Sequence, residues 1–321
     1  MASVEYEYSQ NRMGTTVSLK LFEPNETAAQ TVFNAIKLLE DKLTVNRPKS
    51  ELMSVNQAAG KYPVKVSPAV FALIKQAQEV SLYANSCFNL AIGPLVKLWK
   101  IGFQGNQIPT KEQIEQRLQL TNPHDIKLDA NSHAVFLQKA GMEIDLGAIA
   151  KGYIADVVKT ILNQHKIYQA IINLGGNVFT LGESPINDDG YWQVGLKKPF
   201  SMDNELVGII KVKDKSVVTS GIYERFFVKN ERIYHHIFNP KTGYPLDNEL
   251  ESVTIISNTS LEGDIYSTIL YGLGVEKGKE YLKNHQNLSA VYLTKSKTIK
   301  LINPNNFSFS LLDDQYKVEL G

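Results

Sequence analysis

The sequence has a single cysteine, almost no net charge and no long hydrophobic run. Cys87 alone cannot form an internal disulfide bond, and it excludes a zinc site built from cysteines. The net charge of +1 argues against nucleic acid as the main partner. No apolar stretch is long enough to span a membrane, and no signal peptide is visible. Apolar residues make up 43% and charged residues 21%, which is typical of an ordinary globular protein.

The chain also lacks internal repeats and low-complexity linkers. Its length permits one large domain or two small ones. Helical and strand patterns are mixed without strict alternation, which favours an α+β fold. The opening Met1-Ala2-Ser3 is typical of a cloning junction, so we expect that an export signal or lipid anchor has been removed ahead of it.

Hydrophobic periodicity predicts where the helices and strands lie. Helices are predicted over residues 28–46, 51–56, 68–84, 110–117, 149–162, 260–271 and 275–286. Residues 4–22 read as a hairpin or a bulged long strand, with a break at Met13-Gly14-Thr15. Further strands are predicted at 135–137, 143–146, 170–173, 289–293 and 297–302, with several more within 207–256.

A strand-to-helix turn near the middle of the chain carries the first candidate chemistry. The predicted strand 143–146 enters the predicted helix 149–162 through Gly147-Ala148, with almost no loop. Such a turn leaves backbone N–H groups at the helix start, where anions are favoured. Asp145 and Lys151 lie close to the same helix end, and together these features suit a phosphorylated ligand. The alternative is a tight turn with a surface salt bridge.

A second polar group lies near the start of the predicted helix 260–271. Thr259 and Glu262 form a capping-box pattern, which indicates that a helix begins here. Asp264 and Thr268 are four residues apart and share one helix face. A carboxylate and a hydroxyl suit a hard cation such as Mg²⁺, and we expect such a site carboxylate not to be a core residue. The alternative is a polar pair that satisfies local hydrogen bonds.

Two further motifs have a functional and a structural interpretation. The pair His235-His236 suits a metal ligand or a general base, although adjacent strand residues point to opposite faces and only one would face a site. The alternative is a strand histidine followed by a turn at 239–243. Gly175 and Gly176 follow a predicted strand and let a backbone approach a ligand closely, but they do not form a dinucleotide-binding fingerprint.

Short motifs occur in one order along most of the chain, and no single one of them is decisive. The series begins with Met13-Gly14-Thr15, Ser50-Glu51-Leu52 with Asn56, and Phe88-Asn89 followed by Gly93-Pro94-Leu95 and Trp99. It continues with Asp145-Leu146-Gly147 to Lys151-Gly152 and Asp156, Gly175-Gly176-Asn177, and Thr219-Ser220-Gly221 with Tyr223-Glu224-Arg225. It closes with His236-Ile237, Pro240-Lys241-Thr242-Gly243, and Asp264 with Thr268. The ordered series resembles that of the FAD:protein FMN transferases, the ApbE family.

The resemblance implies a fold, an activity and a location. The fold would be the ApbE-type, T-fold-like arrangement of mixed sheets packed with helices. It would form one domain over residues 1–321, with two lobes as an option and FAD in a cleft between them. The enzyme would use Mg²⁺ to transfer FMN from FAD to a threonine or serine of an exported flavoprotein, forming a phosphoester and releasing AMP. The acceptor would carry a Ser/Thr-Gly-Ala/Ser-Thr motif. The location would be extracytoplasmic, at the outer face of a bacterial membrane or in the periplasm, with membrane contact only through a lipid anchor.

The resemblance also implies roles for individual residues. Asp264, Thr268 and the main-chain carbonyl of Ala148 would bind Mg²⁺. His236 would lie near the phosphates as a proton acceptor, a role for which Asp264 is also a candidate. The FAD-binding residues would be Met13, Asn46, Asp145, Lys151, Gly175, Gly176, Ser220 and Glu224.

Two positions depart from the family pattern. Many members carry a tyrosine over the flavin ring where this chain has Asn46, and an asparagine there opens the ring pocket. The open pocket motivates an alternative function, the Mg²⁺-dependent hydrolysis of FAD to FMN and AMP. A third, non-enzymatic alternative is an FAD-binding protein. Aspartate is common in the family where Asn239 stands, which puts a charge role there in doubt.

Overall fold

The computed structural model describes residues 4–83, 85–103, 105–203 and 205–321, so the expected junction at Met1-Ala2-Ser3 lies outside the described residues. The chain forms two compact units. Unit 1 comprises Met1–Glu40, Ile149–Gly221 and Glu249–Gly321, and unit 2 comprises Asp41–Ala148 and Ile222–Asn248. Within the described ranges, none of the helices combines the length and apolar character that a membrane crossing requires.

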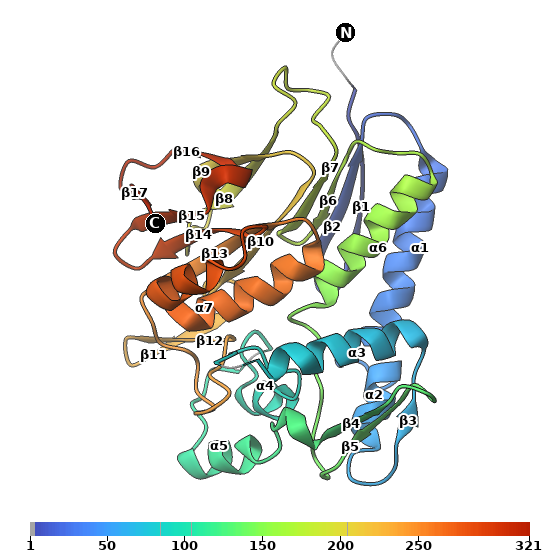
Figure 1. Ribbon diagram of the computed structural model, residues 1–321. Coiled ribbons are helices and arrows are strands. Elements are labelled where there is room, and N and C mark those ends of the chain that lie inside the picture. Colours follow the sequence, from blue (N-terminus) through green and yellow to red (C-terminus); the bar gives the residue numbers. More distant parts are fainter. Residues whose placement is uncertain (1–3, 84, 104, 204) are drawn as a thin grey trace. The chain divides into compact units, whose positions relative to one another are not determined.

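Unit 1 is built on a nine-stranded sheet (Figure 1). In sheet order the strands are β1 (Tyr6–Arg12), β2 (Thr15–Leu21), β6 (Ala170–Leu174), β7 (Asn177–Leu181), β10 (Lys215–Gly221), β13 (Leu250–Ser257), β14 (Ser289–Thr294), β15 (Thr298–Ile302) and β17 (Lys317–Leu320). Neighbours are antiparallel except for the parallel pair β15–β17. A second sheet has the order β16 (Ser308–Leu311), β9 (Leu206–Val212) and β8 (Trp192–Lys197), and a 3-10 turn η2 spans Pro304–Asn306.

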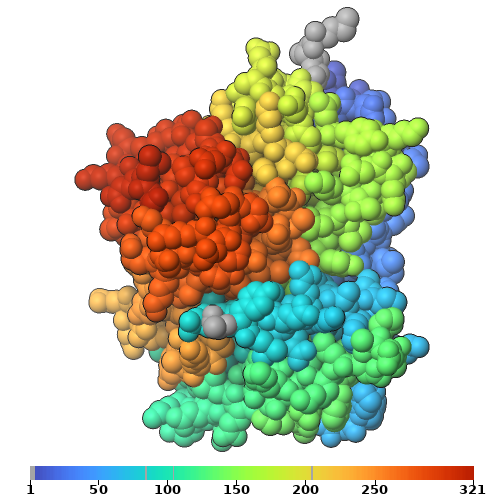
Figure 2. Space-filling view, in the orientation of Figure 1, coloured from blue at the N-terminus to red at the C-terminus, as the bar shows by residue number. Residues whose placement is uncertain are grey.

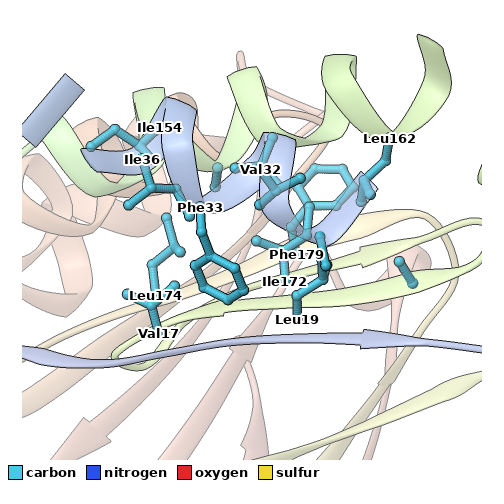
Figure 3. Close-up of a cluster of buried hydrophobic side chains, with 14 of the residues drawn as sticks. Val17, Leu19, Val32, Phe33, Ile36, Ile154, Leu162, Ile172, Leu174 and Phe179 are labelled. Atoms are coloured by element: carbon cyan, nitrogen blue, oxygen red, sulfur yellow. The ribbon is translucent and has the colours of Figure 1, made fainter. Parts of the chain in front are cut away.

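Helices cover one face of the large sheet. They are α1 (Glu26–Leu43, which begins in unit 1), α6 (Ala150–Gln164) and α7 (Ser260–Leu282). Apolar side chains of α1 and α6 pack onto β2, β6 and β7 (Figure 3). The packing of α1 on the sheet is possible because Val32, Ile36 and Leu39 recur on one helix face, as the periodicity predicts. The small sheet packs on the opposite face of the large one, where Trp192 and Ile210 meet Val217 of β10.

The described residues of unit 2 form two small sheets and four short helices. The helices are α2 (Glu51–Gln57), α3 (Pro68–Ser81), α4 (Gly93–Trp99) and α5 (Lys111–Leu118), with a 3-10 turn η1 at Pro123–Asp125. One sheet has the order β3 (Val64–Lys65), β5 (Ala134–Leu137) and β4 (Ile126–Asp129), and the other is the hairpin β11 (Phe226–Lys229) and β12 (Arg232–His235). The buried indole of Trp99 donates a hydrogen bond to Gly243 O (2.9 Å), which fastens the 239–243 turn to α4.

The predicted α+β class is confirmed, as are the hairpin within 4–22 and the helix break before residue 275. The break falls at Gly274, whose φ of +72° is not helical, although α7 continues across it. The helix ends predicted at 46 and 286 are wrong, since α1 ends at Leu43 and α7 at Leu282. The helix predicted to end at Ala84, outside the described residues, ends at Ser81.

The strand predicted at 143–146 is also wrong. The backbone of residues 143–146 forms hydrogen bonds to a side chain and to a loop, and it does not pair with a neighbouring strand. Ile144 N–H donates to Asn56 Oδ1 (2.8 Å), and Ile144 O accepts from Asn56 Nδ2 (3.0 Å). Asp145 N–H donates to Leu90 O (2.8 Å). An alternating apolar pattern cannot distinguish this extended segment from a sheet strand.

Candidate active site

Two tight hairpin turns lie side by side at one end of the large sheet of unit 1. Met13-Gly14 joins β1 to β2 and Gly175-Gly176 joins β6 to β7, each as a two-residue turn with positive φ at both positions. Such turns match the strand twist and favour glycine. A Cβ on Gly175 would lie 2.4 Å from the Thr15 side chain, whereas one on Gly176 would meet nothing within 4 Å. The predicted ligand residues Met13, Gly175 and Gly176 are therefore neighbours.

Ser220 reaches the same end of the sheet through β10. Val218 pairs with Asn177, the residue after the glycine turn, so the following residues of β10 continue past that turn. Ser220 Oγ donates to Ser267 Oγ (2.8 Å), and Ser267 Oγ donates to Asp264 O (3.1 Å). These contacts join Ser220 to the turn of α7 that carries Asp264 and Thr268.

A carboxylate from each of α6 and α7 caps the N-terminus of the other helix. Asp156 of α6 accepts hydrogen bonds from Ser260 N–H (2.8 Å) and Leu261 N–H (2.9 Å) at the start of α7. In return, Asp264 Oδ2 accepts from Gly152 N–H at the start of α6 (2.5 Å). Carboxylates are favoured at helix N-termini. The residues of α6 and α7 are in contact, and their surfaces, green for α6 and orange for α7, adjoin on one face of unit 1 (Figure 2). The Gly152 N–H group at the start of α6 is therefore hydrogen-bonded to a carboxylate of the protein itself.

Gly152 permits the close approach of the two helices. A Cβ at this position would lie 2.3 Å from Ser260 O and 2.8 Å from Asp264 Oδ2. Real Cβ atoms do not come that close to other atoms. The glycine is therefore needed for packing.

Asp264 is buried, with 6% of its surface exposed, so the expectation that it lies outside the core is wrong. Its Oδ1 accepts a hydrogen bond from Asn177 Nδ2 (3.0 Å). Asn177 Oδ1 in turn accepts from Ser260 Oγ (2.6 Å), and Ser216 Oγ donates to Ser260 Oγ (3.1 Å). A buried carboxylate is tolerated here because each of its oxygens has a donor.

The environment of Asp264 opposes its charge. Burial raises the pKa of the Asp264 carboxyl from 3.8 to about 6, against the lowering effects of Lys151, the Gly152 N–H and Asn177. The half-buried Lys151 lies in the first turn of α6. Within the described residues its ammonium group makes no salt bridge, so the alternative of a surface salt bridge at Lys151 is not supported. Lys151 thus places an available positive charge beside the buried carboxylate.

Asp264 and Thr268 fit a hard cation in their donor chemistry. Each Asp264 oxygen accepts one hydrogen bond and keeps a second lone pair. The Thr268 hydroxyl lies one turn further along and makes a long hydrogen bond to Asp264 O (3.4 Å). In the described part of the chain, no group of three or more His, Cys, Asp or Glu side chains is arranged to hold a metal ion. Two oxygen donors of this kind suit Mg²⁺, which takes much of its shell from water and phosphate.

Unit 2 carries the other predicted residues. Asp145 Oδ1 accepts from Gly147 N–H (2.7 Å), which closes the turn that leads to the exposed Ala148. Burial raises the pKa of this half-buried Asp145 carboxyl, while the Gly147 N–H and Arg225 lower it. Arg225 O accepts from the backbone N–H of His236 (3.2 Å). Asp145 and His236 are therefore both neighbours of Arg225.

The two histidines differ in burial, but only His235 belongs to β12, and His236 lies just past the end of the strand. His235 is buried, donates from Nε2 to Leu246 O (2.8 Å) and accepts at Nδ1 from Ile237 N–H (3.3 Å). Both ring nitrogens of His235 are thus engaged in holding the loop. His236 is half-buried, and its Nδ1 lies 3.2 Å from Arg225 O, which can only accept. His236 therefore carries its proton on Nδ1, and Nε2 is the basic nitrogen of the neutral ring.

Other sequence predictions receive less support from geometry. Asn46 is exposed after α1, with its backbone N–H donating to Thr44 Oγ1 (3.2 Å), and Glu224 is exposed next to Arg225. The FAD roles of Asn46 and Glu224 stay predictions, as do those of Met13, Asp145, Lys151, Gly175, Gly176 and Ser220. The Ala148 carbonyl as a third ligand of the metal and the FAD cleft also stay predictions.

Sequence reasoning missed the residues that hold Asp264. The ordered motif series includes Asn177, Gly152 and Asp156, but it does not indicate a role for any of the three. Ser216 and Ser260 carry no signal at all, because serine is common in strands and at helix starts. A glycine directly after Lys151 was the one available hint of close packing.

Comparisons with known proteins identify the family of the chain. A model of the ApbE family matches residues 13–292. An FAD:protein FMN transferase of Klebsiella pneumoniae is 51% identical over 98% of this chain and 96% of its own. One of Treponema pallidum is 33% identical over 92% of this chain and 86% of its own. The crystal structure of the ApbE protein of Thermotoga maritima has a TM-score of 0.83 at 27% identity, covering 94% of this chain and 98% of its own. The flavin transferase ApbE of Vibrio cholerae has a TM-score of 0.80 at 26% identity, covering 97% and 98%. The chain belongs to the ApbE family.

Proposed function

We propose that this protein is an FAD:protein FMN transferase that moves FMN from FAD to a threonine or serine hydroxyl of an acceptor protein. The observation that carries the proposal is the gathering of Met13, the Gly175-Gly176 turn, Lys151, Ser220 and Asp264 at one end of the large sheet. Two relatives that bear this enzyme name, at 51% and 33% identity, support it.

The reaction exchanges the phosphoanhydride bond of the FAD pyrophosphate for a phosphoester bond to the acceptor. The acceptor hydroxyl oxygen attacks the phosphorus on the FMN side of the pyrophosphate. A new P–O bond forms, the bond to the bridging oxygen breaks, and AMP leaves with that oxygen. The proton of the hydroxyl passes to a base on the protein. The tight glycine turns and the Lys151 ammonium bind and orient the phosphates, which carry two negative charges.

Asp264 and Thr268 would hold Mg²⁺ in this proposal. Their oxygen donors and the spare lone pairs of Asp264 suit the ion. A bound Mg²⁺ supplies positive charge where negative charge builds on the phosphate oxygens. The Ala148 carbonyl is proposed as a further ligand on the basis of the family resemblance alone.

His236 is the proposed proton acceptor. Its Nδ1–H donates to Arg225 O, which leaves Nε2 as the basic atom. Asp264 is less suited to this role, because its remaining lone pairs are assigned to the cation. A base is needed because a hydroxyl is a weak nucleophile.

The acceptor and the location complete the proposal. The acceptor is a flavoprotein with a Ser/Thr-Gly-Ala/Ser-Thr motif, and the protein acts outside the cytoplasm, with any membrane contact made through a lipid anchor. The family resemblance supports both statements. Fractionation of cells that express the full-length native protein tests the location, and detection in the cytosol alone would contradict it.

One assay separates this function from its alternatives. FAD and Mg²⁺ are incubated with and without a peptide containing Asp followed by Ser/Thr-Gly-Ala-Thr, and FAD, FMN, AMP and peptide are resolved by chromatography. Transfer gives a covalently fluorescent peptide and an equal amount of AMP. AMP release at the same rate without peptide would indicate hydrolysis, which the exposed Asn46 makes worth testing. Intact FAD in the presence of Mg²⁺ would indicate a binding protein. The absence of labelled peptide at saturating FAD would refute the proposal.

A further inference from the structure

A buried chain of hydrogen bonds leads from the interior of unit 1 to the Asp264 carboxylate. Ser216 of β10 donates to Ser260, Ser260 donates to Asn177 Oδ1 (2.6 Å), and Asn177 Nδ2 donates to Asp264 Oδ1 (3.0 Å). Asn177 is 2% exposed, and both serines are fully buried. Because these three side chains are buried, they can affect a bound ion only through Asp264.

The chain fixes the direction of the Asn177 amide. Asn177 Oδ1 receives a hydroxyl hydrogen from Ser260, so this atom is the oxygen and the donor nitrogen must point at Asp264. Ser260 in turn lies at the start of α7, whose N–H groups are held by Asp156. Ser260 therefore fixes the orientation of the Asn177 amide, which donates one N–H to Asp264.

Two donors then fix the plane of the carboxylate. Gly152 N–H holds Oδ2 from the start of α6 and Asn177 Nδ2 holds Oδ1 from β7. A carboxylate fixed at both oxygens cannot rotate about its Cβ–Cγ bond without losing a charge-assisted hydrogen bond. The remaining lone pairs of the two Asp264 oxygens therefore point in fixed directions.

We infer that Asn177 and, through it, Ser260 are positioning residues that orient Asp264 for cation binding. The inference rests on the proposed function through the metal role of Asp264. Residues that orient a ligand in this way typically change metal affinity or activity by about 10–100-fold when they are replaced.

The test measures metal binding directly. Mn²⁺ is titrated into the full chain at saturating FAD without acceptor, and the free ion is followed by electron paramagnetic resonance, with FAD alone as the blank. The variants are Asn177→Leu, which has nearly the same volume, Ser260→Ala and the double variant. Thr180→Val is the matched control, because Thr180 is a buried polar residue of the same strand whose hydroxyl bonds to Lys215 O (2.9 Å) and not to Asp264.

The expected effects follow the order of the hydrogen bonds, which connect Ser260 to Asn177 and Asn177 to Asp264. Asn177→Leu weakens Mn²⁺ binding about 10–100-fold and lowers kcat at saturating FAD, while the KM for the acceptor peptide stays unchanged. Ser260→Ala has a smaller effect, and the double variant binds Mn²⁺ no more weakly than Asn177→Leu, because Ser260 acts through Asn177. Thr180→Val binds Mn²⁺ like the parent, even if it lowers Tm as much.

Parent-like Mn²⁺ binding by Asn177→Leu would overturn the inference and leave the transferase proposal standing. If Asn177→Leu does not fold, Ser260→Ala decides, and parent-like binding by Ser260→Ala then refutes the inference. If the parent transfers no FMN but the variants lose Mn²⁺ in the stated order, the proposed function fails and the positioning role holds.

Discussion

The buried Asp264 carboxylate should make the stability of unit 1 fall as the pH rises. Burial raises its pKa from 3.8 to about 6 in the folded protein. A carboxyl with a raised pKa favours the protonated form when folded, so its contribution is full below pH 3.8 and is lost as the pH rises through about 6. Each pH unit is worth about 1.4 kcal/mol, so the loss amounts to about 3 kcal/mol.

Asp264→Asn isolates this effect because the amide does not titrate. Free energies of unfolding are measured from guanidinium titrations of both proteins between pH 3.5 and 7, without divalent cations. Tryptophan fluorescence follows the transition, and the buried Trp192 reports on unit 1. The asparagine amide places a donor where the carboxylate has an acceptor, which costs stability. This free-energy cost is the same at every pH, so it cancels when the difference in stability between the two proteins is compared across pH values.

The stability of the parent relative to Asp264→Asn should therefore fall by about 3 kcal/mol across this range. Most of the change should lie between pH 4 and 6.5, and Mg²⁺ with FAD should reverse it at pH 7, because binding of the cation to the folded state favours the charged carboxylate. A difference that stays constant with pH would refute the reasoning, as would one that rises with pH.

Four further predictions test Asp264 and neighbouring parts of the site. Asp264→Asn should lower the rate of FMN transfer at least about 100-fold, measured as labelled peptide, and parent-like transfer would remove Asp264 from the metal site. Gly152→Ala should destabilise the protein by about 1–3 kcal/mol in guanidinium unfolding, because its Cβ would lie 2.3 Å from Ser260 O; an unchanged midpoint would contradict the packing argument. Asp156→Ala should cost about 1–2 kcal/mol, since it removes the cap from two N–H groups of α7, and a loss of transfer without a loss of stability would instead give Asp156 a role in the site. Lys151→Met should weaken FAD binding in an equilibrium fluorescence titration while Tm changes by no more than about 2 °C, as expected for a half-buried lysine that forms no salt bridge with the described residues; unchanged FAD affinity would exclude Lys151 from phosphate binding.

Local patterns in the sequence determined the parts of this protein that depend on neighbouring residues. The break at Met13-Gly14 predicts the hairpin, because a two-residue turn with positive φ needs glycine and the flanking strands alternate. The four-residue spacing of Asp264 and Thr268 places both on one face of α7.

Only the tertiary structure decided what surrounds Asp264. Its two hydrogen-bond donors, Gly152 and Asn177, lie 112 and 87 residues away in the sequence. They meet Asp264 because β7 pairs with β10 and because α6 and α7 approach closely enough for each to cap the other. The same limit explains why 143–146 was predicted as a strand, although its backbone bonds to the distant side chain of Asn56. Periodicity reports which face of a segment is apolar, but the identity of the segment that covers this face depends on long-range packing, which no local pattern contains.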